Sequence, residues 1–108
     1  MPHSEPSGLF RALGDPTRRA LFERLCRDGE QTVVALTAGS GVSQPAVSKH
    51  LGVLKHAGLV QGRPEGRQTH YSAQLKALAP LIDWTSQMTG FPRSRSSGWS
   101  SRSGGRAP

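Results

Sequence analysis

Cysteine is nearly absent from this chain. Cys26 is the single cysteine among 108 residues, so no disulfide and no cysteine-based metal cage can form within one chain. No apolar run approaches the roughly 18 residues that a membrane-spanning helix needs. The opening residues, MPHSEPSG, lack the apolar core of a signal peptide. We therefore expect a cytoplasmic protein without membrane association, in which Cys26 is a small buried hydrophobe rather than a redox switch.

Acidic residues are also scarce. Lysine and arginine number 14 against 7 aspartate and glutamate residues, which gives a formal net charge of +7. Residues 90–108 contain four arginines and no acidic residue, and residues 43–72 hold four lysines and arginines against Glu65 alone. A basic excess of this kind indicates a polyanionic partner, nucleic acid before an anionic membrane surface.

Large aliphatic residues are missing from the C-terminal segment, residues 90–108. This segment holds six serines, four glycines and two prolines, and it could not bury enough apolar surface to offset its chain entropy. We predict that it is disordered and that the folded unit covers residues 7–89. The composition fits either a basic arm or an altered reading frame at the 3′ end of the coding sequence. A basic arm would add phosphate contacts that weaken with salt.

Helix signals are present from the start of the predicted folded unit. A short apolar stretch that ends at Gly14 predicts one or two helical turns. Asp15 as N-cap and Pro16 at the first helical position then predict a helix that runs to about Arg27. The residues expected on its inward face are Ala20, Leu21, Phe22 and Leu25.

Two further helices are expected before residue 58. Thr32 predicts the N-cap of a short helix, which the small residues at 38–41 end. Ser43 predicts the N-cap of a helix from Ser43 to Ala57, with Pro45 in its first turn. The apolar residues at i, i+4 and i+7 of this helix form a core stripe: Val47, Leu51 and Leu54.

Beyond Gly58 the pattern changes to β-structure. Residues 59–63 and 68–72 read as two short strands on either side of the turn-forming sequence 64–67. A last helix is expected at about residues 74–88, with Pro80 as a kink or a restart point. The predicted fold class is therefore mainly α with a small β-hairpin.

The two predicted helices that Thr32 and Ser43 cap form a helix-turn-helix pattern, because two short helices are joined by a glycine-containing turn. The second helix of such a pair needs an apolar face toward the core and a small polar face at its N-terminus. Gln44 could pair with adenine, Ser48 with a base or a phosphate, and Lys49 with guanine or a phosphate. Composition alone fits an ordinary amphipathic helix with a solvated polar face equally well. The hairpin that follows, with Arg63 and Arg67 about its tip, favours a wing that grips DNA.

Three segments carry a family resemblance: GLFRALGDPTRRALFERL, VSQPAVSKHLGVLKHAGLV and GRQTHYS. They resemble the ArsR-type winged-helix repressors of bacteria and archaea over about residues 7–88. The resemblance implies a winged helix-turn-helix domain that binds an imperfect palindrome in double-stranded DNA, usually near its own operon. The DNA contacts that it implies are Ser43, Gln44, Pro45, Ser48, Lys49, Arg63, Arg67 and His70. It also implies a homodimer through the first and last helices, whose apolar residues are Leu9, Phe10, Leu13, Leu78, Leu81, Ile82 and Trp84.

Many members of the family that this chain resembles release DNA when a metal ion binds. One sensor type carries Cys-Val-Cys before the recognition helix, and the matching positions here are Thr32 and Val34. A second type uses His, Asp and Glu on the last helix, which here offers only Asp83. Neither set can build a metal site. We therefore expect a repressor that uses no metal ion and no cofactor.

Other classes of function fit the sequence less well. We expect no enzyme, because no glycine-rich phosphate loop follows a strand and no nucleophile has an arranged base. A winged-helix module that binds a protein partner is an alternative, although protein interfaces favour aromatic anchors over the Ser, Gln, Lys and Arg surface expected here. A sequence-tolerant DNA binder that uses the basic tail is a further alternative.

Overall fold

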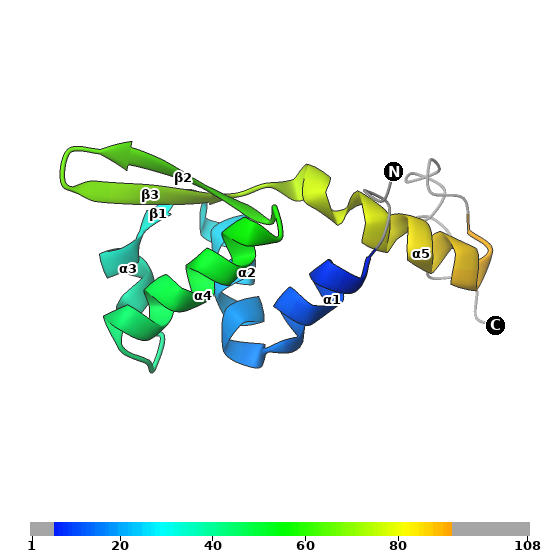
Figure 1. The fold of residues 1–108 in the computed structure, drawn as a ribbon, viewed down its shortest axis with the longest axis horizontal. Helices are drawn as coiled ribbons and strands as arrows, with labels where there is room; N and C mark the ends of the chain where they lie inside the picture. The colour runs from blue at the N-terminus through cyan, green and yellow to red at the C-terminus, as the bar shows by residue number, and fades with distance from the viewer. Residues whose placement is uncertain (1–5, 92–108) are drawn as a thin grey trace.

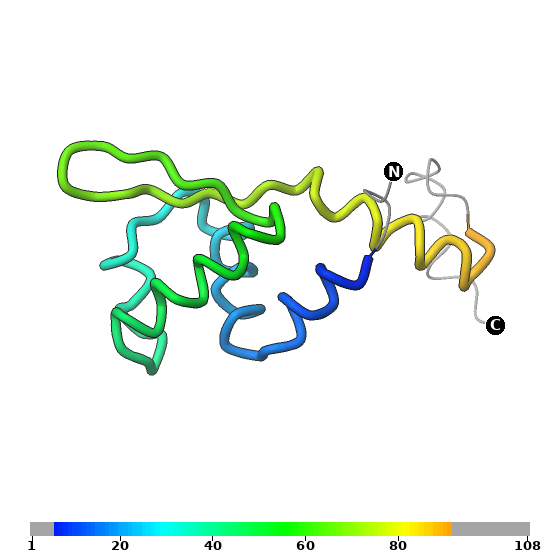
Figure 2. Tube along the Cα trace, viewed as in Figure 1, coloured from blue at the N-terminus to red at the C-terminus, as the bar shows by residue number. Residues whose placement is uncertain are grey.

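The computed structural model describes residues 6–91, and the tail assigned above to disorder lies largely outside them. In chain order the elements are α1 (Ser7–Gly14), α2 (Pro16–Asp28), β1 (Gln31–Thr32), α3 (Val33–Thr37), α4 (Gln44–His56), β2 (Val60–Glu65), β3 (Gln68–Ala73), the 3-10 helix η2 (Leu75–Leu78) and α5 (Ala79–Thr89). Figure 1 shows α2, α3 and α4 packed together beneath the hairpin, with α1 beside them and α5 extending away. The tip of the hairpin and α5 lie at opposite ends of the molecule (Figure 2).

The predicted N-caps are confirmed, because each cap bond joins residues only three apart. The Asp15 carboxylate accepts a hydrogen bond from the Arg18 amide at 2.9 Å at the start of α2. Thr32 Oγ1 accepts one from the Ala35 amide at 3.1 Å at the start of α3. Ser43 Oγ accepts one from the Ala46 amide at 3.3 Å at the start of α4. These bonds satisfy amides that have no partner within their own helix.

The core lies where α2, α3 and α4 meet the base of the hairpin. Its fully buried side chains come from these elements and from the residues that follow α4: Leu25, Leu36, Val47, Leu51, Leu54 and Leu59. Each buried leucine contributes roughly 1.5–3 kcal/mol relative to an exposed one. The stripe predicted for α4 is thus confirmed, and it fixes this helix to the body of the domain.

The hairpin belongs to a three-stranded antiparallel sheet with the order β1-β3-β2. The fold class predicted from the sequence is confirmed, but β1 was not predicted. This strand has two residues, and its partners Tyr71 and His70 lie about forty positions along the chain. The strands of the hairpin also continue to Glu65 and Gln68, so the turn is shorter than expected. Pro64 is tolerated because β2 is an edge strand.

Three expectations for single residues are wrong. Ala20 and Cys26 are exposed, although both were expected to be buried. Cys26 follows the buried Leu25, and a helix turns by about 100° for each residue, so it points away from the core. Leu9, expected on a dimer surface, is only 6 % exposed in the single chain and belongs to its core.

The last predicted helix is divided into two elements. The 3-10 helix η2 ends at Leu78, and α5 begins at Ala79 with Pro80 in its first turn. Pro80 is therefore a restart point rather than a kink, because a first-turn proline needs no amide partner.

Candidate nucleic-acid interface

The N-terminal end of α4 is the exposed part of a firmly anchored helix. Its core stripe is fully buried, with 0 % exposure for Val47, Leu51 and Leu54. The polar residues that the sequence assigned to DNA contact here are all exposed: Ser43, Gln44, Pro45, Ser48 and Lys49. Unpaired amides at a helix N-terminus favour a phosphate group. The arrangement presents polar side chains to solvent on a helix whose apolar face is held in the core.

The turn between α3 and α4 is held by Arg24, which sequence reasoning missed. Its guanidinium donates hydrogen bonds to the carbonyl oxygens of Leu36 at 3.1 Å, Ala38 at 3.0 Å and Ala35 at 2.9 Å. These carbonyls lie at the C-terminal end of α3, where none has a partner further along the helix. The Arg24 side chain is 27 % exposed. It therefore fixes the first helix of the pair against α2.

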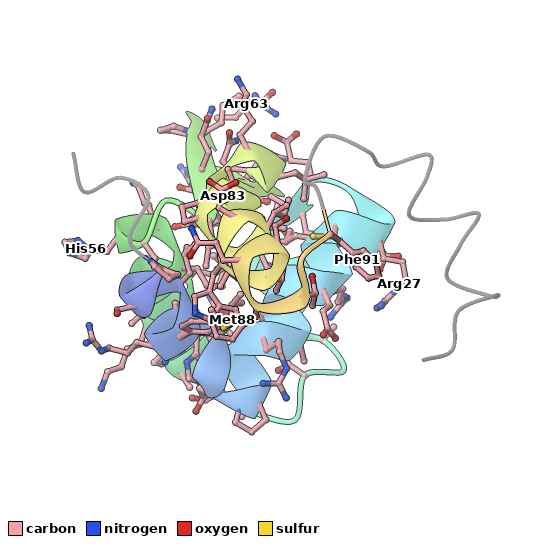
Figure 3. The ribbon with its side chains drawn as sticks, turned by 90° about the vertical axis from the view of Figure 1, so that its right-hand side faces the viewer. Arg27, His56, Arg63, Asp83, Met88 and Phe91 are labelled. Atoms are coloured by element: carbon pink, nitrogen blue, oxygen red, sulfur yellow. The ribbon has the colours of Figure 1, made fainter. Side chains whose placement is uncertain are left out.

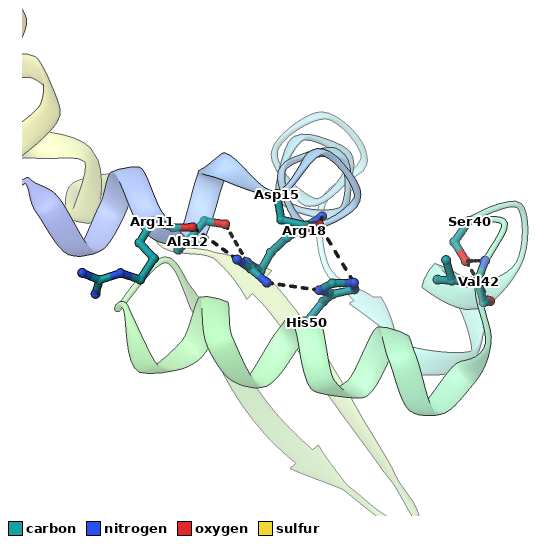
Figure 4. A network of polar contacts seen from close by, with 7 residues as sticks. All are labelled: Arg11, Ala12, Asp15, Arg18, Ser40, Val42 and His50. Carbon is teal, nitrogen blue, oxygen red and sulfur yellow. Dashed lines mark hydrogen bonds and ion pairs between the residues drawn. The ribbon is translucent and has the colours of Figure 1, made fainter.

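Arg18 provides a second clamp, at the C-terminal end of α1. Its Nε donates to the Ala12 carbonyl at 2.6 Å and its Nη2 to the Arg11 carbonyl at 3.2 Å. The same guanidinium contacts His50 of α4, whose Nε2 atom lies 4.0 Å from Oδ2 of Asp15 (Figure 4). The hydrogen bond from the Arg18 amide, with the charges of His50 and Arg18, holds the pKa of Asp15 below its usual value. This cluster ties the recognition helix to α1 and α2.

The wing residues occupy three different environments. Arg67 lies in the turn of the hairpin and is exposed, with no ion pair among residues 6–91. Arg63 lies within β2 and is bound to two carboxylates, Glu30 at 2.9 Å and Glu65 at 2.7 Å. His70 is half-buried, and its Nε2 atom lies 3.7 Å from Glu65 Oε1. The basic groups do not form a single patch, because Arg27, His56 and Arg63 lie on different sides of the molecule (Figure 3).

An apolar surface lies on α1 and α5, away from the wing. The rings of Phe10 and Trp84 meet edge to face, with centroids 5.2 Å apart and planes at 83°. Both remain partly exposed, Phe10 at 45 % and Trp84 at 39 %, and Ile82 and Met88 of α5 are exposed as well. The other residues predicted for dimer contact, Leu13, Leu78 and Leu81, are half-buried against the core.

Residues 6–91 have three further features that bear on the site: their possible metal ligands, the lengths of their helices, and Cys26. Within this part of the chain no three His, Cys, Asp or Glu side chains are grouped as metal ligands would be. None of its helices is long and apolar enough to cross a membrane. Cys26 is exposed, but partial desolvation of its thiol, with the charge of Glu23, raises its pKa. A raised pKa lowers the fraction of reactive thiolate.

Comparisons with known proteins place this geometry among transcriptional regulators. A family model described as a helix-turn-helix domain matches residues 13–63. An HTH-type transcriptional regulator of Mycobacterium tuberculosis is 43% identical over 94 residues, 82% of this chain and 87% of that protein. The arsenical resistance operon repressor of Escherichia coli is 38% identical over 79 residues, 71% of this chain and 68% of the repressor. The fold is similar to the solved structure of an ArsR-like transcriptional regulator from Rhodococcus, with a TM-score of 0.66. The two sequences are 32% identical, and the match covers 78% of this chain and 77% of that one.

Proposed function

This chain belongs to the ArsR family of winged helix-turn-helix regulators, and we propose that it is a homodimeric repressor that reads an imperfect palindrome near its own or a neighbouring operon. The relatives that it matches are a transcriptional regulator and an operon repressor. The proposal adds the residues that read DNA, the dimer and the absence of a metal requirement.

The exposed N-terminal end of α4 is the observation that carries the proposal. Gln44, Ser48 and Lys49 offer amide, hydroxyl and ammonium groups within about one helical turn. Amide side chains match the edge of adenine, and ammonium groups match guanine or phosphate. Ser43 and Pro45 complete the exposed end, where the helix dipole favours a phosphate. Arg67 at the hairpin turn adds a cation that can reach the flanking backbone.

The apolar surface on α1 and α5 supports a homodimer. Phe10, Ile82, Trp84 and Met88 leave large side chains partly in solvent on adjoining helices. Trp84 and Met88 lie four residues apart on α5 and so share one of its faces, and contiguous exposed apolar groups mark interaction sites in soluble proteins. A twofold dimer presents two recognition helices, which matches the symmetry of a palindromic operator. The half-buried Leu13, Leu78 and Leu81 support this surface from beneath.

The residues at the two metal-sensor positions of the family support metal-independent repression. Thr32 Oγ1 is occupied as the N-cap of α3, and Val34 has no ligand atom. Asp83 on α5 is the single carboxylate of that helix. One hard ligand cannot form a tetrahedral site.

Selection from a random-sequence duplex library with the full chain tests the proposal directly. We expect recovered duplexes to share two inverted half-sites about one helical turn apart. Binding to the recovered operator should be unchanged by EDTA or by added Zn²⁺. Recovery of no common sequence would refute sequence-specific repression, and loss of binding on metal addition would refute the metal-independent form.

A further inference from the structure

Three charged side chains link the hairpin to the body of the domain, and we call them the wing bridge: Glu30, Arg63 and Glu65. Arg63 Nε and Nη2 donate to the two carboxylate oxygens of Glu30 at 3.3 and 2.9 Å, a two-pronged contact. Its remaining nitrogen, Nη1, donates to Glu65 Oε1 at 2.7 Å. All three guanidinium nitrogens are therefore bound to carboxylates of this chain.

The wing bridge spans the sheet from one edge to the other. Arg63 lies on the edge strand β2, and Glu30 immediately precedes β1 on the opposite edge, with β3 between them. Glu65 lies two residues after Arg63 on the same strand, so both side chains extend from one face. His70 of β3 pairs with Arg63 in the strand register and approaches Glu65. The contact is thus placed to fix the direction of the hairpin relative to the helices.

The pKa shifts of the three side chains reflect the close contact between Arg63 and the two carboxylates. The hydrogen bonds from Arg63 lower the pKa of both Glu30 and Glu65 and raise the pKa of Arg63 itself. One guanidinium faces two carboxylates, so the three side chains of the wing bridge together carry a net negative charge. Without Arg63, Glu30 would lose its ion pair and Glu65 would keep only His70 beside it, next to a wing that must approach phosphates. Exposed ion pairs contribute little one by one, but a two-pronged contact within a network is the favourable case.

We propose that Arg63 is a positioning residue of the wing, and that Arg67 at the hairpin turn supplies the phosphate contact. This inference rests on the proposed function, and it revises the DNA contact that the family resemblance assigns to Arg63. Arg63 acts by holding the hairpin against Glu30 and by neutralising charge that would repel DNA. Its guanidinium remains on the carboxylates when the operator is bound.

A charge exchange in the full chain tests the inference. Dissociation constants for the selected operator are measured by fluorescence anisotropy over a range of NaCl concentrations. Arg63→Glu should weaken binding by at least about tenfold, because it places like charge near phosphates and frees the wing. The double variant Glu30→Arg/Arg63→Glu again has one arginine and two carboxylates in the wing bridge. We expect this double variant to return to within about fivefold of the wild type. A double variant as weak as Arg63→Glu would overturn the inference.

The salt dependence of binding gives a second measurement that does not depend on the exchange. Arg67→Gln should reduce the slope of log Kd against log salt by about 0.9, the value for one lost phosphate contact. The neutral variant Glu30→Gln/Arg63→Gln/Glu65→Gln should keep the wild-type slope, because it removes no contact with DNA. A reduction of about 0.9 in the neutral variant would assign Arg63 to a phosphate and overturn the inference. Failure of the wild type to bind any duplex would instead refute the proposed function, and this inference with it.

Discussion

The imidazole of His50 on the recognition helix lies against the guanidinium of Arg18, with its Nδ1 atom 3.4 Å from Arg18 Nη1. The other ring nitrogen, Nε2, faces the Asp15 carboxylate at 4.0 Å. One imidazole thereby joins α4 to the clamp that Arg18 forms on α1 (Figure 4).

We expect the Arg18 and His50 side chains to be coupled in their effect on stability. Arg18→Ala should be the more destabilising single change, because it also frees the carbonyls of Arg11 and Ala12. A double-mutant cycle with His50→Ala, followed by urea unfolding, should give a coupling of about 0.5–1 kcal/mol. Strictly additive effects would show that the contact between the two side chains contributes nothing. His56→Ala, an exposed histidine on the same helix, is the matched control.

The starts of α2, α3 and α4 could be predicted from the sequence, whereas the clamps between helices could not. Asp15, Thr32 and Ser43 each cap a helix through an amide three residues away, so the signal is local. Arg24 reaches carbonyls that lie 11 to 14 positions along the chain. The sequence does not distinguish an arginine that faces solvent from one that binds the carbonyls of another helix, because the contacts of Arg24 arise only when α2 packs on α3.

The residues of the candidate site also divide into those whose place could be predicted from the sequence and those whose place could not. Exposure of Gln44, Ser48 and Lys49 follows from the helical period once Val47 is assigned to the core. The pairing of Arg63 with Glu30 could not be foreseen, because 33 residues separate them and β1 was not predicted. The wrong expectation for Cys26 came from the usual burial of free cysteine, which the position of Leu25 on the helix overrides.

Arg24 should be a major determinant of the stability of the helix-turn-helix. Arg24→Lys keeps the charge but removes the fork that reaches three carbonyls, so we expect a loss of about 2 kcal/mol in the free energy of unfolding. Chemical denaturation followed by circular dichroism measures the loss. Arg27→Ala is the matched control, because its guanidinium is exposed and pairs only weakly with Asp28. Equal effects of the two substitutions would contradict the role assigned to Arg24.

Gln44 should determine which base the recognition helix prefers. Gln44→Ala should reduce the ratio of operator to random-duplex affinity by about tenfold, since a two-bond contact with a base discriminates by about 1–3 kcal/mol. Affinity for a random duplex should change little. Gln87→Ala, an exposed glutamine on α5, should leave the ratio unchanged. A Gln44→Ala variant with undiminished discrimination would remove Gln44 from the set of base-reading residues.

Stability should fall in acid, in part through the N-cap of α2. The pKa of Asp15 is lower in the folded chain than in the unfolded chain, where it is about 3.9. Its contribution is therefore complete above the unfolded pKa and is lost as the pH falls through the folded pKa. Glu30 and Glu65 act in the same direction, because their pKa values are lowered as well.

The variant Asp15→Asn distinguishes the effect of the N-cap hydrogen bond on stability from the effect of the carboxylate charge. Asparagine caps a helix about as well as aspartate but does not titrate. The melting temperature of Asp15→Asn should therefore lie close to that of the wild type at pH 3 and fall below it at pH 6. A constant difference between the two proteins at both pH values would show that the ionisation of Asp15 does not contribute to folding.

Trp84 should be required for the dimer. Trp84 and Phe10 stack edge to face while leaving much of both rings in solvent, so a second copy can cover them without moving the helices. Trp84→Ala should raise the dissociation constant of the dimer by at least about 30-fold, since buried aromatic anchors commonly contribute 2 kcal/mol or more to an interface. Sedimentation velocity at micromolar concentrations measures the change, and circular dichroism confirms that the variant folds. Val34→Ala is the control, because Val34 is also a large exposed apolar residue but lies on α3, at the other end of the molecule from α5 (Figure 1). If Trp84→Ala sediments as the wild type does, the dimer must form through another surface. The spacing of the two recognition helices would then no longer follow from α1 and α5.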